Sequence, residues 1–191
     1  MASDVGARRP DHVVALSEVL HVFALAAALV GAGSLTLIRR GVGLPEVAAA
    51  ALMFIGMADA MTLALLPPIM WFAVMLPAAL ALAARCRSSR GGEAAAGGRS
   101  SVLTGHLALG LVSTAALILL MTTMTPGSVA APAGHAHGGS AMMPQMMGGA
   151  FGIGALLLGA IALRAERSWA HRLHHVTMAA STVAMSAIVI L

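Results

Sequence analysis

The chain has 191 residues, of which 59% are hydrophobic and 9% are charged, with a formal net charge of +4. A soluble domain carries roughly 25% charged residues, so this composition excludes an ordinary soluble globule and favours a protein embedded in a lipid bilayer. All eleven basic residues are arginines that lie between apolar stretches, not in a patch with aromatic residues, so we expect no nucleic-acid partner. Cys86 is the single cysteine, which excludes an intramolecular disulfide.

The apolar stretches predict one transmembrane helical domain. Residues 1–12 form a polar N-terminal tail, and residues 13–191 form the domain. The apolar run from residue 48 to residue 84 would be about 55 Å long as one helix, nearly twice the hydrocarbon thickness, so Pro67-Pro68 is expected to divide it. The predicted spans are 13–38, 45–66, 69–84, 102–124, 148–163 and 174–191, with an outer His/Met-rich loop over 125–147. The expected fold is therefore all-α, a polytopic integral membrane protein with a bundle of about six transmembrane helices.

The first apolar segment has two interpretations. Arg8-Arg9 ahead of it and the small residues near its end are typical of a cleaved signal peptide. Glu18 and His21 lie inside the segment, and ionisable groups are unusual in the apolar part of a signal peptide. We therefore expect a retained span.

The arginines predict the orientation of the spans, because cytoplasmic loops are enriched in basic residues. With the N-terminus outside, nine of the eleven arginines fall in inner loops, whereas the opposite orientation leaves only Arg8 and Arg9 inside. We therefore expect N-out and C-out topology. The lack of Lys, Tyr and Asn beside abundant Ala, Gly and Arg is typical of a GC-rich bacterial genome, so we expect the host membrane to be a bacterial plasma membrane. The predicted inner arginines are Arg39, Arg40, Arg85, Arg87, Arg90, Arg99, Arg164, Arg167 and Arg172.

Asp59 is the acidic residue placed deepest in a predicted span, where a charge costs roughly 2.5–3.5 kcal/mol to insert. We expect it to be a buried polar residue facing the bundle interior. We also expect Asp59→Leu to fold at least as well as the wild type, because the substitution removes this cost. Met53, Met57 and Met61 recur every four residues on nearly the opposite face of the same helix, so they are expected to pack against another helix or lipid.

Glu18 and His21 lie three residues apart, on one face of the first span. A carboxylate and an imidazole at that spacing can bind one metal ion. The alternative is that the two side chains pair with each other or reach water at the membrane surface.

Histidines also mark the inner ends of two later spans. His171, His174 and His175 share an arc of about 100° with Met178, Thr182 and Met185, which predicts one continuous stripe. His106 precedes Ser113-Thr114 as His174 precedes Ser181-Thr182, and both helices run outward, so these histidines are expected to lie level. They are candidate metal ligands, candidate axial haem ligands (His106 with His174 or His175), or plain interfacial histidines with methionine as filler.

The predicted outer loop has the most unusual composition. Thioethers and imidazoles suit copper, and thioethers favour Cu(I). The alternative is a loop of small and apolar residues resting on the membrane surface. The loop candidates are His135, His137, Met142, Met143, Met146 and Met147, and the candidates at the outer ends of the spans are Glu18, His21, Met121, Met124 and Met185. We expect replacement of the four loop methionines by leucine to lower Cu(I) affinity without loss of stability.

Several segments resemble a family of small actinobacterial polytopic membrane proteins known only as a domain of unknown function. The segments are LMFIGMADAM, the Pro-Pro-x-x-Trp at 67–71, GHLALGLVSTAA, the His/Met-rich outer loop and the closing HHVTMAASTVAM. The resemblance covers residues 15–191 and is a pattern of residue types. It implies a polytopic helical fold, and it implies no chemistry and no functional residues.

These features predict a membrane protein that binds or handles a soft metal ion such as copper and is not an enzyme. No serine-hydrolase elbow, metalloprotease helix, phosphate loop or dinucleotide fingerprint is found in the sequence. The alternatives are a non-catalytic structural or partner subunit of a membrane complex, and a haem-binding redox protein. A homo-oligomer or a membrane-protein partner fits either alternative.

Overall fold

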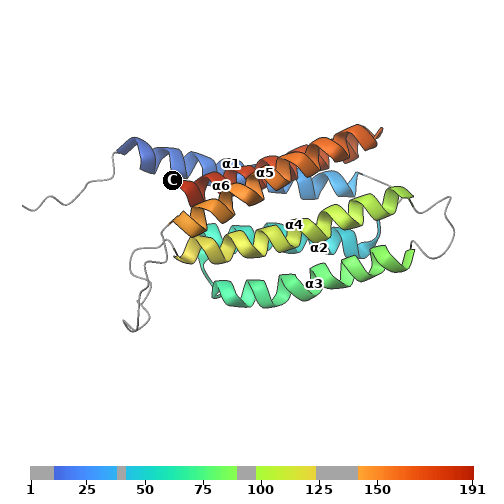
Figure 1. Cartoon of the computed structure of the whole chain (residues 1–191), viewed down its shortest axis with the longest axis horizontal. Coiled ribbons are helices and arrows are strands. Elements are labelled where there is room, and N and C mark those ends of the chain that lie inside the picture. Colours follow the sequence, from blue (N-terminus) through green and yellow to red (C-terminus); the bar gives the residue numbers. More distant parts are fainter. Residues whose placement is uncertain (1–10, 38–41, 90–97, 124–141) are drawn as a thin grey trace, which may run out of the picture.

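The computed structural model describes residues 11–37, 42–89, 98–123 and 142–191, and this part of the chain is helical without a strand (Figure 1). Six helices within these residues are long and apolar enough to cross a membrane, which confirms the predicted all-α, polytopic class. The helices are α1 (Asp11–Thr36), α2 (Leu44–Ala58), α3 (Pro68–Ser89), α4 (Gly98–Thr123), α5 (Met142–Ala165) and α6 (Trp169–Ile190), and a π-helical turn η1 (Asp59–Leu63) follows α2.

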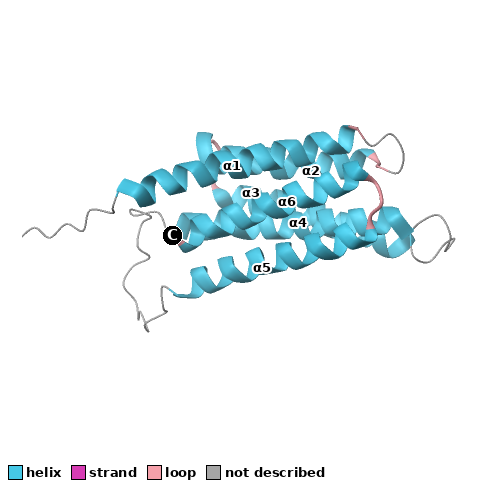
Figure 2. Ribbon diagram, turned by 90° about the horizontal axis from the view of Figure 1, so that it is seen from above, coloured by secondary structure: helices cyan, strands magenta, loops and turns pink. Residues whose placement is uncertain are grey.

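The helices run antiparallel to their neighbours along the chain and form an elongated bundle (Figures 1 and 2). Helix α6 packs along both α1 and α5, and α3 packs along α4, while α4 also contacts α6. Large apolar side chains such as Val22, Leu80 and Ile161 point outward and are more than half exposed. An outward-facing apolar surface of this kind suits lipid as the surrounding medium.

One end of the bundle carries every arginine in the described residues, and we call it the arginine end. It comprises the last turns of α3 and α5, the turn between α5 and α6, and the first turns of α4 and α6 (right in Figure 1). The described arginines there are Arg85, Arg87, Arg99, Arg164, Arg167 and Arg172.

Several predicted boundaries differ from the observed ones. The outer loop was predicted to reach residue 147, but residues 142–147 are helical, so that part of the prediction is wrong. Met and Gln are good helix formers, and Pro144 lies in the first turn, where its missing N–H breaks no helical hydrogen bond. Helix α3 continues to Ser89 and α6 begins at Trp169, because polar residues can extend a helix beyond the hydrocarbon layer.

The predicted division of the run from residue 48 to residue 84 is confirmed, but α2 ends before Pro67. Helix α2 passes into η1, and Ala64 then takes a left-handed conformation with φ 48°. Asp59 stabilises this turn: Oδ1 accepts a hydrogen bond from the N–H of Leu65 (2.8 Å), and Oδ2 accepts one from the N–H of Leu66 (3.1 Å). The indole Nε1 of Trp71 donates a third, buried bond at 2.7 Å.

These contacts correct one prediction about Asp59. It is buried as predicted, within the span that ends at Leu63. It also anchors the turn between α2 and α3, so the expected tolerance of Asp59→Leu has to be reversed. The predicted packing role of the methionine stripe is confirmed for Met53 and Met57, which are buried in the core.

Candidate metal centre

Three histidines from two helices meet inside the bundle. His106 of α4 and His174 and His175 of α6 each offer a nitrogen, and these three nitrogens all lie within 4.8 Å of one another. The ring of His106 is edge-on to that of His175, with centroids 4.5 Å apart, and lies 6.1 Å from that of His174. The prediction that His106 and His174 lie level is thereby confirmed. We call these residues the histidine cluster.

The histidine cluster is buried near the arginine end. His174 and His175 are both 0% exposed, and His106 is partly buried. Since a helix rises 1.5 Å per residue, the three side chains lie about 5 to 9 Å inside the ends of the apolar spans that begin at Leu103 and Trp169.

A hydrogen bond fixes the tautomer of His174. Its Nδ1 lies 2.8 Å from the carbonyl oxygen of Gly31 in α1, and a carbonyl only accepts, so Nδ1 carries the proton. The Nε2 atom of His174 is therefore left with a lone pair and has no hydrogen-bond partner. Metal-binding histidines commonly donate their other ring nitrogen to a backbone carbonyl in this way.

Gly31 allows α1 to approach α6 closely enough for this bond. A Cβ atom at position 31 would lie 2.8 Å from both Sδ of Met178 and Oγ1 of Thr177, closer than real Cβ atoms come to a neighbour. The absence of a side chain therefore positions the carbonyl that orients His174.

His175 has no hydrogen bond at either ring nitrogen, although both atoms are buried. Buried polar atoms in native proteins nearly always have a partner, and each exception needs an explanation. Each neutral imidazole has one lone pair, so Nε2 of His174 and one ring nitrogen of His175 each offer a lone pair beside a nitrogen of His106, as a metal ion requires of its ligands.

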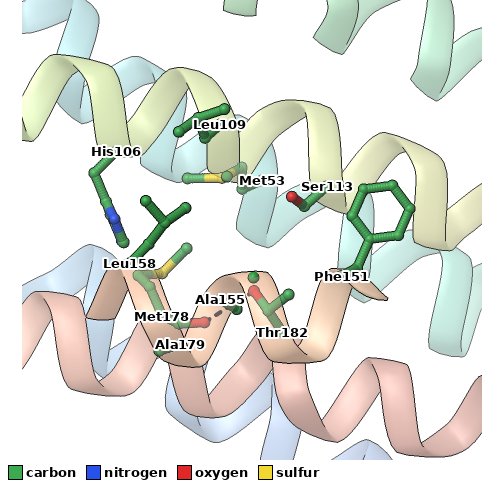
Figure 3. A pocket seen from close by; sticks show the side chains of 12 residues that line it. Met53, His106, Leu109, Ser113, Phe151, Ala155, Leu158, Met178, Ala179 and Thr182 are labelled. Atoms are coloured by element: carbon green, nitrogen blue, oxygen red, sulfur yellow. Dashed lines mark hydrogen bonds between the residues drawn. The ribbon is translucent and has the colours of Figure 1, made fainter. Parts of the chain in front are cut away.

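A cavity of about 230 Å³ adjoins the histidine cluster at His106 (Figure 3). It lies between α4, α5 and α6, and Met53 of α2 also reaches it. Figure 3 shows the imidazole of His106 pointing across the cavity toward Leu158 and Met178. Met53 and Met178 place two thioether groups on the cavity wall, and Ser113 and Thr182 place two hydroxyl groups there.

The separation of the nitrogens fits a single metal ion after small adjustments. Imidazole nitrogen binds zinc at about 2.0–2.1 Å, so nitrogens on one trigonal or tetrahedral ion stand roughly 3.3–3.6 Å apart. Nitrogens within 4.8 Å of one another would have to close by at most roughly 1.5 Å to bind one ion.

The same geometry disfavours haem. Two axial histidines bind opposite faces of the iron, with the macrocycle between their rings. The rings of His106 and His175 are edge-on with centroids only 4.5 Å apart, and a macrocycle does not fit between them. The rings of His106 and His174 are 6.1 Å apart, but the ring of His175 lies within 5.5 Å of both and takes up the space that a macrocycle between them would need.

The structure does not bring together the outer candidates that lie in its described residues. Met143 and Met146 are 68% and 71% exposed on the first turns of α5, and Met147 is also exposed, whereas Met185 is packed in the core. Glu18 is exposed as well. His21 donates from Nδ1 to the backbone oxygen of Ser17 at 2.7 Å, so it is tied to its own helix.

The remaining outer candidates give no further support. Met121 packs at the edge of the core, and the side chain of Met142 is not described. His135, His137 and Met124 lie outside the described residues, so the prediction of a copper site there is untested.

Two features of the site were missed by sequence reasoning. Met53 was interpreted only as a packing residue, and the four-residue stripe gave no sign that one member reaches the cavity beside His106. The carbonyl of Gly31 was also missed, because a backbone acceptor from another helix leaves no pattern in the sequence.

No protein-family model matches the chain, and no curated protein or solved structure is detectably similar to it.

Proposed function

We propose that this multi-pass membrane protein binds Cu(I) at the histidine cluster and acts as a non-catalytic metal-handling protein. The observation that carries the proposal is the burial of three unpartnered imidazole nitrogens on His174 and His175 against His106. An unsatisfied buried polar group costs about 1–3 kcal/mol, so a protein with a purely structural role gains nothing from this arrangement. A bound ion accepts the lone pair of Nε2 of His174 and that of the unprotonated ring nitrogen of His175.

Charge favours a monovalent ion. Neutral imidazoles do not offset the charge of the ion, and the Born cost of burying a charge rises with its square, so a divalent ion costs roughly four times as much as a monovalent one. The thioethers of Met53 and Met178 on the adjoining cavity are soft ligands, which also favour Cu(I).

The first prediction is that the purified protein binds one equivalent of Cu(I), and that His106→Phe lowers the affinity by at least about 100-fold. This variant keeps an aromatic ring and removes the nitrogens, and even loss of an outer-shell partner of a metal ligand costs 10–100-fold. Affinity is measured by competition with a Cu(I) chelator in detergent micelles, with circular dichroism as the check on folding.

Two control variants locate the site. His21→Phe makes the same change on α1, away from the cluster, and should leave affinity within about twofold, since it removes no member of the cluster. The quadruple change of Met142, Met143, Met146 and Met147 to leucine tests the outer candidates. If that change abolishes binding while His106→Phe does not, the site is outside and the proposal is wrong.

We further propose that the arginine end is cytoplasmic, so that both termini are outside, and that the host membrane is a bacterial plasma membrane. The arrangement of the described arginines at one end supports this orientation through the positive-inside tendency.

The second prediction is that, in a Cys86→Ser background, an impermeant thiol reagent labels Gly139→Cys but not Ala95→Cys in intact cells. The reverse labelling pattern would invert the orientation.

A further inference from the structure

Two polar side chains at the arginine end precede the histidine cluster in the chain. Glu166, in the turn between α5 and α6, has a side chain that is 5% exposed. Its Oε2 lies 3.7 Å from Nδ1 of His171, near the start of α6. This Nδ1 atom is buried and has no hydrogen-bond partner. We call Glu166 and His171 the access pair.

Helix geometry connects the access pair to the histidine cluster. His171 precedes His174 and His175 by three and four residues, so the three side chains are neighbours on one face of α6, with Cβ atoms about 5–6 Å apart. Exposure falls along this face, from 16% for His171 to 0% for His174 and His175. An ion that arrives from water at the arginine end and moves along this face meets His171 before the cluster.

The arginines at this end make the Glu166 carboxylate important for the approach of a cation. Several arginines there repel an approaching cation, and a local acid can offset their field. Glu46, the other acid described at this end, already accepts hydrogen bonds from the N–H of Gly43 (3.0 Å) and from Oγ1 of Thr104 (3.1 Å). The carboxylate of Glu166 instead faces His171, which precedes His174 by three residues on α6.

We propose that Glu166 and His171 form an access site that binds a cation transiently, through one carboxylate oxygen and one imidazole nitrogen, and passes it to His174 and His175. This inference rests on the proposed function. The access pair offers two ligands and the histidine cluster offers three, so the ion is held more tightly at the cluster. The pair therefore governs how fast the ion enters and leaves, and the cluster governs how tightly it is held.

The third prediction follows from this division of roles. Glu166→Gln and His171→Gln should each slow both the association and the dissociation of Cu(I) by about tenfold or more, as expected when one barrier on a shared route is raised. The equilibrium affinity should change by less than about threefold, because the two rates fall together. Stopped-flow mixing in detergent micelles measures association from a weak Cu(I) chelator and dissociation into an excess of a strong one.

The matched controls are Glu18→Gln and His21→Gln, which make the same changes on α1 near the opposite end, and both rates should stay at wild-type values. Unchanged rates in the access-pair variants would overturn the access site. Slower association with faster dissociation in Glu166→Gln would also overturn it, since that result shows only a charge effect on the bound ion. If the wild-type protein binds no Cu(I), the proposed function itself fails, which the equilibrium titration reveals before any rate is measured.

Discussion

Replacing His175 with leucine is expected to stabilise the metal-free protein while abolishing Cu(I) binding. Both ring nitrogens of His175 are buried without a hydrogen-bond partner, and the residue is 0% exposed. An apolar side chain of similar volume removes this cost, which is about 1–3 kcal/mol for an unsatisfied buried group. Water that enters from the cavity beside His106 would bring the gain toward the lower end of that range.

The measurement is the midpoint of unfolding by SDS in mixed micelles, without metal, together with the Cu(I) competition titration. His174→Leu is the comparison, because it breaks the bond to the carbonyl of Gly31 and should stabilise less or destabilise. A large loss of stability in His175→Leu would mean that the imidazole packs for structural reasons. The histidine cluster would then lose its main support as a metal site.

The helical class and the six spans could be predicted because both depend on local properties of the chain. Apolar stretches of bilayer length with few charges identify spans without knowledge of their neighbours. The ends of the spans were less predictable, as α5 shows. Met142, Pro144 and Gln145 were placed in a loop by their Pro- and Gly-rich surroundings, yet the residue types themselves allow a first helical turn.

The histidine cluster could be predicted in part. Helical periodicity placed His171, His174 and His175 on one face, and the alternation of the spans placed His106 level with His174. The rotation of α4 and α6 about their own axes turns these faces toward each other. It depends on packing between helices, so the sequence of one helix cannot predict it. The bond from His174 to Gly31 joins residues 143 positions apart, so no local pattern could indicate it.

Asp59 shows how a local cost argument can mislead. An acid in an apolar segment was expected to be a burden that leucine would relieve. Its three donors lie six, seven and twelve residues further along the chain, in the turn after η1 and at the start of α3. The sequence predicted the break at Pro67-Pro68 but not that Asp59 accepts hydrogen bonds from both sides of it. The cost of burying the carboxylate is offset by these bonds, so the sign of the predicted effect changed once the turn was known.

Asp59→Leu is expected to destabilise the protein by about 2–4 kcal/mol, since each buried donor left unpaired costs about 1–3 kcal/mol. Water can reach the N–H groups of Leu65 and Leu66, whose bonds are partly buried, so the buried indole of Trp71 accounts for most of the loss. The turn also holds Ala64 at φ 48°, which costs a non-glycine residue roughly 1–2 kcal/mol and depends on the contacts around it.

Asp59→Asn is the matched variant, because it keeps the shape and one acceptor oxygen, and its loss should be smaller than that of Asp59→Leu. The SDS unfolding midpoint gives both values, and Trp71→Phe in the wild-type and Asp59→Leu backgrounds completes a double-mutant cycle. A coupling energy above about 0.5 kcal/mol is expected if the carboxylate and the indole are bonded. If Asp59→Leu unfolds at the wild-type midpoint, the carboxylate does not anchor the turn. Its hydrogen bonds then do no more than offset the cost of burying it.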